Sequence, residues 1–219
     1  MPKGKSRIFI VDDHPIMRDG IAQLINQQPD LVVCGEASSA PEALESLDRI
    51  EPELMLVDIS LTGMDGIELI KIVRKRRPSL PMLVLSMHPE ALYAERSVRA
   101  GAKGYVMKHA SPGTLLEAMR RVLSGKVFLS PEMTEKLLER AAGDGLGRDE
   151  SPVASLSDRE VEIFKLIGRG LKPQRISEEL HLSVKTVETY ASRIKLKLGL
   201  KDASELLQMA ISWRGHFEE

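Results

Sequence analysis

The chain has 219 residues, 42% of them hydrophobic and 29% charged, which suffices for one large domain or two small ones with a buried core. Its formal net charge of −1 excludes a protein that binds nucleic acid through an overall positive charge. A single cysteine, Cys34, excludes an internal disulfide, and no apolar run approaches the roughly 18 residues that span a bilayer. We therefore expect a cytoplasmic protein with no membrane partner.

The first 124 residues alternate short aliphatic runs with stretches of helical spacing. This alternation predicts βα units, because a long crossover must return the chain before a second parallel strand can form. We expect an α/β domain over 1–124 whose five parallel strands form a doubly wound sheet. The expected strands are 7–12, 31–37, 53–59, 82–87 and 104–108.

The alternation stops after residue 124. Residues 125–152 are expected to be a linker, with room for a helix over 131–142. The stretch "GDGLGRDESPVAS" (143–155) is rich in Gly, Asp, Ser and Pro and has no apolar period, as is typical of a tether. Helical spacing alone follows over 153–219, which predicts a small all-α domain of four helices.

Polar side chains stand where the expected strands end. Asp12 and Asp13 close the first, Asp58 the third, Ser86 the fourth and Lys108 the fifth. The carboxyl ends of parallel strands meet at one edge of a sheet, where ligands bind. Three clustered carboxylates repel one another unless a hard divalent cation takes them as ligands, and Mg²⁺ suits such a site. A carboxylate beside Mg²⁺ and a lysine can accept a phosphoryl group.

Helix capping is the alternative explanation for the aspartate pair. An aspartate at a helix start accepts backbone N–H bonds, and Pro15 fits a first helical turn. One aspartate would suffice for that role, so the convergence of the strand ends explains Asp12 and Asp13 better.

Four motifs, "VDDHP", "LVDISLTGMDG", "LVLSMH" and "GAKGYVMKHA", resemble the receiver domains of response regulators over residues 7 to about 124. The resemblance implies a flavodoxin-like sheet with strand order 2-1-3-4-5 and makes Asp58 the phosphoacceptor. It implies that Lys108 binds the phosphoryl group, and that Ser86 and Tyr105 move toward it as switch residues. The metal ligands that it implies are Asp12, Asp13, Asp58 and Ser60. By themselves, Ser86 could be a turn residue and Tyr105 a core aromatic.

The sequence departs from the receiver pattern at two positions. Thr62 stands where the family usually has proline, and His109 follows Lys108 where many receivers have proline. Neither change removes a chemical group from the pocket. His88, two residues after Ser86, is expected to be a solvated loop histidine rather than a pocket residue.

The helical domain carries a local positive patch. Ser157 and Glu160 form the capping-box pattern at a helix start. A later helix is expected to bury a stripe of Val187, Ala191, Ile194 and Leu198. Residues 169–201 contain eight basic and three acidic side chains, in a chain of net charge −1. Such an excess suits a phosphate backbone better than a merely solvated helix face.

The stretch "ISEELHLSVKTVETY" resembles a LuxR-type helix-turn-helix, and with the receiver motifs the chain is similar to the NarL/FixJ family of two-component response regulators. By position, base contacts are expected from Glu188, Thr189 and Ser192, and Glu188 replaces a lysine of many members. The other expected DNA-binding residues are Lys172, Lys185, Thr186, Arg193 and Lys197. The implied partners are a sensor histidine kinase, double-stranded DNA and, on activation, a second copy of the chain; RNA polymerase is a further partner that the resemblance allows.

Two other functions share parts of the pattern expected of a phosphorylation-controlled transcription factor. An aspartate-nucleophile phosphatase or phosphotransferase would share Asp58, Mg²⁺ and Lys108, but it typically needs an acid two residues after the nucleophile, where this chain has Ser60. A receiver-like binding module that is never phosphorylated would not need all five pocket groups. The resemblance therefore favours a regulator and not an enzyme.

Overall fold

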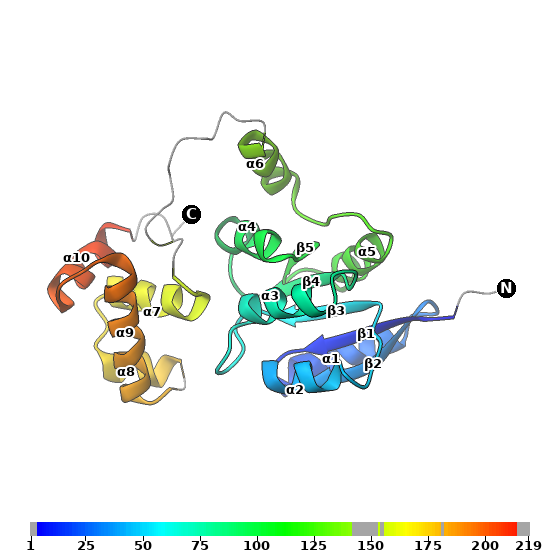
Figure 1. Ribbon diagram of the computed structural model, residues 1–219, viewed down its shortest axis with the longest axis horizontal. Coiled ribbons are helices and arrows are strands. Elements are labelled where there is room, and N and C mark those ends of the chain that lie inside the picture. The colour runs from blue at the N-terminus through cyan, green and yellow to red at the C-terminus, as the bar shows by residue number, and fades with distance from the viewer. Residues whose placement is uncertain (1–3, 142–152, 154–155, 181, 214–219) are drawn as a thin grey trace. The chain divides into compact units, whose positions relative to one another are not determined.

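The computed structural model describes residues 4–141, 153, 156–180 and 182–213 (Figure 1). Backbone contacts divide the chain into two units, Met1–Gly147 and Arg148–Glu219. Except for Val153, the tether expected over 143–155 lies outside the described residues. None of the helices in the described ranges combines the length and the apolar character needed to cross a bilayer.

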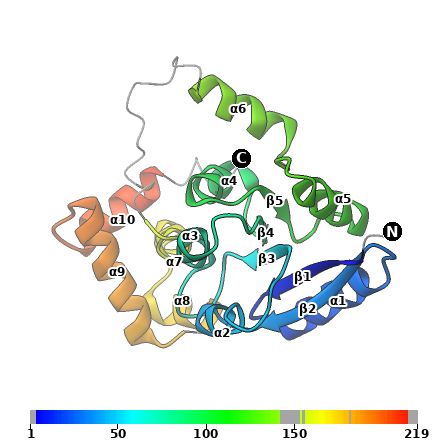
Figure 2. The same cartoon turned by 45° about the vertical axis from the view of Figure 1, so that its right-hand side comes forward.

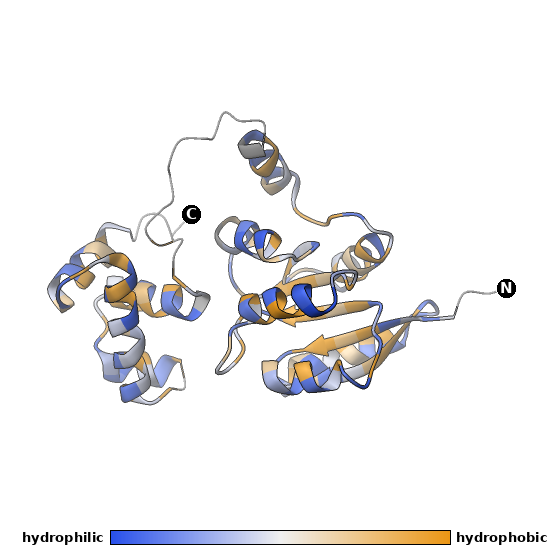
Figure 3. Cartoon of the chain, in the orientation of Figure 1, coloured by the Kyte–Doolittle hydropathy of each residue, from blue (hydrophilic) through white to orange (hydrophobic). Residues whose placement is uncertain are grey.

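The first unit contains the predicted sheet. Its strands are β1 (Ser6–Val11), β2 (Leu31–Ala37), β3 (Leu54–Asp58), β4 (Met82–Ser86) and β5 (Gly104–Met107). All neighbouring pairs are parallel, and the order β2-β1-β3-β4-β5 is the one expected (Figure 2). The strands are almost uniformly hydrophobic (Figure 3), because both faces of a parallel sheet are covered by helices.

Five helices cover the sheet: α1 (Pro15–Asn26), α2 (Ala40–Ser46), α3 (Gly66–Arg76), α4 (Glu90–Ala100) and α5 (Pro112–Leu123). Alternate strand residues such as Ile8 and Ile10 form one core cluster with Ile25 of α1 and Met119 of α5. Helices α2, α3 and α4 contact one another in that order and pack against β2, β3 and β5. This winding leaves the carboxyl ends of the strands together at one edge.

The first unit extends beyond residue 124. Phe128 continues the sheet edge: its backbone N–H donates to the carbonyl of Lys103, and its carbonyl accepts from Tyr105, both at 3.0 Å. The backbone N–H of Ser130 donates to Glu90 Oε1 at 2.9 Å. Helix α6 (Pro131–Ala141) follows and contacts α4, within the stretch where the sequence left room for a helix. The beginning of the expected linker is therefore attached to β5 and α4.

The second unit is a bundle of α7 (Asp158–Gly168), α8 (Pro173–Glu179), α9 (Val184–Leu198) and α10 (Ala203–Ser212), the four helices expected. The predicted capping box is present at Ser157 and Glu160. Helix α7 contacts α9 and α10, and α8 packs against α9. Buried side chains such as Phe164, Ile176 and Ile194 form its core.

Gly66 fixes the distance between helix α3 and the end of β3. Its backbone N–H donates to the carbonyl of Ile59 at 2.9 Å. A Cβ atom at this position would lie 2.0 Å from the carbonyl oxygen of Asp58 and 2.8 Å from Cα of Ile59, both backbone atoms. A side chain at residue 66 would therefore push the helix away from Asp58.

We expect Gly66→Ala to lower the free energy of unfolding by about 1–3 kcal/mol, because the methyl group overpacks rigid backbone. Gly20→Ala is the matched control: no atom lies within 4 Å of the added Cβ, and alanine is the better residue in a helix interior. It should raise stability by about 0.5–1 kcal/mol. Urea unfolding of the full chain, followed by circular dichroism, checks both signs. Equal effects of the two substitutions would contradict the role of Gly66.

Candidate functional site

Charged side chains meet at the carboxyl edge of the sheet, as the sequence predicts. Nζ of Lys108 lies 2.7 Å from Oδ2 of Asp58 and 2.8 Å from Oδ2 of Asp12. All three side chains are at most 3% exposed. The other oxygen of Asp58 accepts the backbone N–H of Ser60 at 3.0 Å. The buried ammonium therefore balances part of the charge that the strand ends bring into the interior.

Burial changes the protonation chemistry of this pair. Burial raises the pKa of the Asp58 carboxyl above its ordinary value; the charge of Lys108 opposes the rise and that of Asp12 adds to it. Burial alone would lower the pKa of Lys108, but the charges and hydrogen bonds of Asp58 and Asp12 raise it. The pocket thus holds a carboxylate that is costly to ionise beside a lysine that stays charged.

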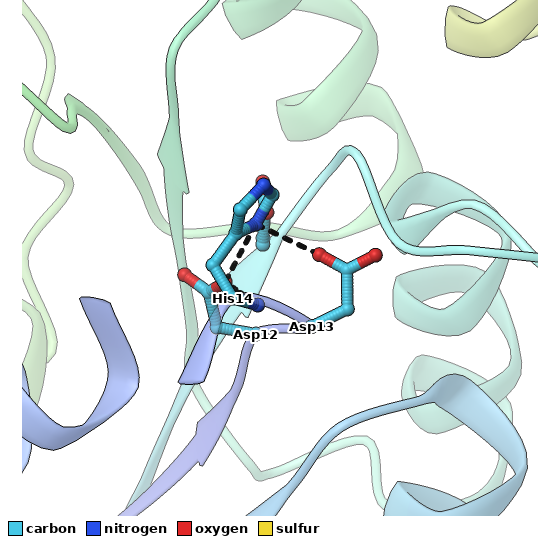
Figure 4. Close-up of side chains that lie close together, drawn as sticks. Asp12, Asp13 and His14 are labelled. Atoms are coloured by element: carbon cyan, nitrogen blue, oxygen red, sulfur yellow. Dashed lines mark hydrogen bonds and ion pairs between the residues drawn. The ribbon is translucent and has the colours of Figure 1, made fainter. Parts of the chain in front are cut away.

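The carboxylates form a cluster with His14. Asp12, Asp13, His14 and Asp58 each place one possible ligand atom within 4.8 Å of the others. Nδ1 of His14 lies 2.9 Å from Asp13 Oδ1 and 3.2 Å from Asp12 Oδ1 (Figure 4). Asp13 Oδ1 is buried against His14 Nδ1, and Lys108 pairs with the two other carboxylates of the cluster, Asp12 and Asp58. Unbalanced negative charge on oxygen donors fits a hard divalent cation such as Mg²⁺.

Asp12 and Asp13 do not cap the helix that follows them. His14 is the N-cap of α1, and its side chain makes no capping hydrogen bond. Asp12 Oδ1 accepts the backbone N–H of His14 at 2.9 Å. Asp13 Oδ2 accepts two bonds from Thr62, one from the backbone N–H at 3.0 Å and one from the hydroxyl at 2.6 Å. The capping explanation is therefore wrong.

Ser86 and Tyr105 both contact the backbone of His88. Ser86 is fully buried, and its Oγ accepts the backbone N–H of His88 at 3.1 Å. Tyr105 is 2% exposed, and its hydroxyl donates to the carbonyl of His88 at 2.8 Å. Tyr105 therefore already occupies an inward position, toward which the sequence-based interpretation expected it to move. The role of a core aromatic accounts for its burial but not for this hydrogen bond.

His88 belongs to the rim of the pocket. Its Nε2 lies 3.0 Å from Ser60 Oγ, and its ring stacks on Tyr93 of α4 with 4.6 Å between ring centroids. The expectation of a solvated loop histidine is wrong, because two tertiary contacts hold the ring. The peptide bond between Lys108 and His109 is trans, as are the other peptide bonds of the described chain.

Sequence reasoning missed three residues at the pocket. His14 was signalled only by its position after the aspartates, and Thr62 only by its departure from proline. Arg18 gave no signal in the sequence. It reaches the end of β1 because one turn of α1 brings its side chain back to that strand end. Its Nη1 donates to the carbonyl of Asp12 at 2.7 Å, and its Nε pairs with Glu36 at 3.1 Å. Arg18 thus fixes the backbone that carries the aspartate pair.

The second unit presents helix α9 after a short turn from α8. The side chain of Ser183 caps α9 by accepting the backbone N–H of Thr186 at 3.0 Å. Of the predicted stripe, Val187 and Ile194 are at most 1% exposed, whereas Ala191 and Leu198 are only half-buried. The opposite face of the helix lies outward. The exposed residues expected to contact DNA are Lys172, Lys185, Glu188, Thr189, Ser192, Arg193 and Lys197.

Internal bonds limit what some of these side chains can donate. The Thr189 hydroxyl donates to the carbonyl of Lys185 at 2.8 Å, and the half-buried Thr186 hydroxyl lies 2.7 Å from that of Ser183. The guanidinium of Arg193 lies over the ring of Tyr190, 5.8 Å from its centroid. A hollow of about 390 Å³ is lined by Ser183, Lys185, Thr186, Thr189, Tyr190 and Arg193. Its two cations make it suitable for an anionic backbone.

Lys197 has a structural partner that the sequence did not predict. Its Nζ lies 2.6 Å from Oε2 of Glu160, a side chain that is 3% exposed. The same oxygen accepts the backbone N–H of Ser157 at 2.6 Å. Lys197 therefore neutralises a buried carboxylate and ties the end of α9 to the start of α7. Its side chain is still 40% exposed, so the expected contact of Lys197 with DNA stays a prediction.

We expect Asp58→Asn to raise the free energy of unfolding at neutral pH in metal-free buffer, because it removes a buried carboxylate whose pKa is raised by folding. A carboxyl whose pKa is higher in the folded than in the unfolded chain destabilises the fold as the pH rises from its unfolded pKa through its folded pKa. The stability gained by Asp58→Asn should therefore grow with pH over that range and then level off. Urea unfolding of the full chain from acidic to neutral pH measures it.

The control for this measurement is Asp48→Asn, which alters an exposed carboxylate outside the pocket. It should leave the free energy of unfolding nearly unchanged at every pH. A gain from Asp58→Asn that shrinks as the pH rises would contradict the raised pKa.

Both units match known families. Residues 8–120 match the response regulator receiver domain, and residues 154–210 match the bacterial regulatory proteins of the luxR family. The chain is 34% identical to the transcriptional activator protein ExaE of Pseudomonas putida, over 93% of this chain and 95% of that protein. It is 33% identical to the oxygen regulatory protein NreC of Staphylococcus carnosus (strain TM300), over 94% and 96% of the two chains.

Solved structures agree with these matches. A LuxR-family two-component response regulator from Aurantimonas sp. SI85-9A1 is 33% identical with a TM-score of 0.58, covering 64% of this chain and 99% of that one. RcsB from Salmonella enterica serovar Typhimurium, bound to promoter rprA with the phosphomimetic BeF3−, is 27% identical with a TM-score of 0.58, covering 95% and 99%. The chain therefore belongs to the two-component response regulators that join a receiver domain to a LuxR-type DNA-binding domain.

Proposed function

We propose that Mg²⁺-dependent phosphorylation of Asp58 by a sensor histidine kinase promotes homodimerisation and sequence-specific binding to double-stranded DNA, and that this regulates transcription. The observation that carries the proposal is the contact of Lys108 Nζ with both Asp58 and Asp12, at 2.7 and 2.8 Å, inside an acidic cluster. A buried cation beside a carboxylate nucleophile is the arrangement that a transferred phosphoryl group needs.

Each pocket residue has a defined part in this transfer. An oxygen of Asp58 forms the new O–P bond while the N–P bond of the donor phosphohistidine breaks, and the electron pair leaves with the imidazole. Asp12, Asp13, Asp58 and the backbone carbonyl of Ser60 are the proposed ligands of Mg²⁺, which neutralises phosphoryl oxygens when bound. Lys108 binds a further phosphoryl oxygen.

The switch follows from the contacts of His88. Ser86 Oγ, now 3.1 Å from the backbone nitrogen of His88, would turn its hydroxyl onto a phosphoryl oxygen. Because Tyr105 is already buried and bonded to the His88 carbonyl, the proposed change lies in Ser86 and the loop carrying His88. Both α4 and β5 contact this loop through Tyr93 and Tyr105, so a loop shift alters the surface available for pairing.

Pairing of two chains would strengthen DNA binding without any new base contact. A single small helical domain buries little surface on DNA, and joining two makes the second contact effectively intramolecular. Structures of the relative RcsB support this arrangement, since they contain RcsB dimers bound to DNA. Phosphorylation of the receiver would thereby control how much of a DNA site with two half-sites is bound.

The surface of α9 supports a division of the DNA contacts. Glu188, Thr189 and Ser192 are proposed to read base edges, and an acidic reader can accept a hydrogen bond from cytosine N4. The proposed contacts to the DNA phosphate backbone, which hold the domain in register without reading the sequence, come from Lys172, Lys185, Thr186, Arg193 and Lys197. RNA polymerase stays a partner proposed from the family resemblance alone.

A phosphatase or phosphotransferase is less well supported. The residue two positions after Asp58 is Ser60, whose hydroxyl lies 3.0 Å from His88 Nε2. A serine hydroxyl is a far weaker acid than the carboxylic acid that would protonate a leaving group.

We expect a small phosphodonor such as acetyl phosphate to label Asp58 only when Mg²⁺ is present. In the full chain, labelling should raise the mass in solution toward that of a dimer and tighten binding to DNA with paired half-sites. Peptide mapping, light scattering and DNA titration measure the three effects on one preparation.

The control is Asp58→Asn, which should neither take the label nor change mass or DNA affinity on treatment. Label on Asp12, Asp13 or a histidine would contradict the assignment of the phosphoacceptor. Full labelling of Asp58 with unchanged mass and unchanged DNA affinity would contradict the proposed switch.

Arg193→Ala should weaken binding to all DNA sequences alike and reduce the dependence of the affinity on salt, because a phosphate contact is lost. Glu188→Ala should instead relax the preference at one base pair, a discrimination of ~1–3 kcal/mol. Selection from a randomised DNA library, followed by titration at several salt concentrations, separates the two effects. Identical sequence profiles for the two variants would show that the contacts are sorted wrongly.

A further inference from the structure

Thr62 makes contacts that the usual proline at its position could not make. It lies in the loop between β3 and α3, four residues after Asp58. Its backbone N–H donates to Asp13 Oδ2 at 3.0 Å, and its hydroxyl donates to the same oxygen at 2.6 Å. Proline has neither a backbone N–H nor a hydroxyl, so both bonds are particular to this departure from the family pattern.

The two oxygens of Asp13 have different surroundings. Oδ2 is occupied by the two bonds from Thr62. Oδ1 is buried and has His14 Nδ1 as its neighbour at 2.9 Å (Figure 4). Thr62 therefore binds one oxygen of the carboxylate and leaves the other directed toward His14 and the acidic cluster.

The loop that carries Thr62 is itself held in place. Ser60 donates its backbone N–H to Asp58 Oδ1, and Gly66 donates to the carbonyl of Ile59. Gly63 has φ of 90°, a left-handed conformation that glycine adopts at little cost. These contacts fix the position of Thr62 relative to Asp58, so its bonds to Asp13 link two of the proposed metal ligands.

We propose that Thr62 is a positioning residue for the metal site: its hydroxyl and backbone N–H orient Asp13 so that Oδ1 alone is presented to Mg²⁺. The inference rests on the proposed function, which assigns Asp13 to the metal. A carboxylate held in its binding orientation loses less rotational freedom when the cation arrives, and hydrogen-bonding partners of metal ligands commonly contribute 10–100-fold to metal affinity.

The test is calorimetric titration of Mg²⁺ into the full chain without any phosphodonor. Thr62→Val removes the hydroxyl but keeps the shape and the backbone N–H, so we expect Kd for Mg²⁺ to rise about 10-fold. Thr62→Ser restores the hydroxyl and should bring Kd back to within about twofold of the parent value. Thr62→Pro, which loses both donors, should weaken binding at least as much as Thr62→Val.

Three controls accompany the titration. Thr134→Val removes a hydroxyl of α6 that donates to the carbonyl of Ser130, away from the pocket, and should leave Kd unchanged. Unfolding midpoints measured in a chelator should be alike for the parent, Thr62→Val and Thr62→Ser. Asp13→Ala should lose Mg²⁺ binding far more than any Thr62 variant does, because it removes the ligand itself.

Equal or tighter Mg²⁺ binding by Thr62→Val would overturn the inference while leaving the metal site intact. Failure of Thr62→Ser to restore the affinity would also overturn it, since the hydroxyl would not be the cause. Absence of Mg²⁺ binding by the parent chain would overturn the proposed metal site, and this inference with it.

Discussion

The ammonium group of Lys108, held between the carboxylates of Asp12 and Asp58, is the interaction on which the pocket depends. Charges this deeply buried must be paired, because the interior cannot solvate them. The sheet supplies the pairing: β1, β3 and β5 end at one edge and bring the three groups within hydrogen-bond distance. The pairing is incomplete, since Asp13 adds a third carboxylate, and this remaining negative charge makes the edge suitable for a cation and a phosphoryl group.

Contacts of two residues link this pocket to the rest of the receiver. His88 reaches Ser60, Ser86 and Tyr93 with its side chain and backbone, and its carbonyl accepts from Tyr105. The backbone N–H of Tyr105 donates in turn to the carbonyl of Phe128, in the segment between α5 and α6. The segment that leads into α6 is therefore hydrogen-bonded to a residue that contacts the loop at the pocket rim.

The basic residues of the second unit have two kinds of surroundings. Glu160 is buried and is satisfied by Lys197 and by the backbone of Ser157, so one basic residue of the local patch stabilises the bundle. Lys185 and Arg193 are exposed and border the hollow beside α9. A count of basic residues along the sequence cannot distinguish these two uses, because it contains no information on which cation meets a buried anion.

The sequence by itself determined the sheet and the four-helix bundle, because hydrophobic periodicity is a local property of each element. It also determined the meeting of Asp12, Asp58 and Lys108, because the carboxyl ends of parallel strands lie at one edge of the sheet. The polar face of α9 followed from the same helical periodicity. Only the tertiary structure decided the roles of Thr62, His88 and Lys197, whose partners are 49, 28 and 37 residues away. Their hydrogen bonds depend on how loops and helix ends approach one another, and no spacing rule within a single element describes that approach.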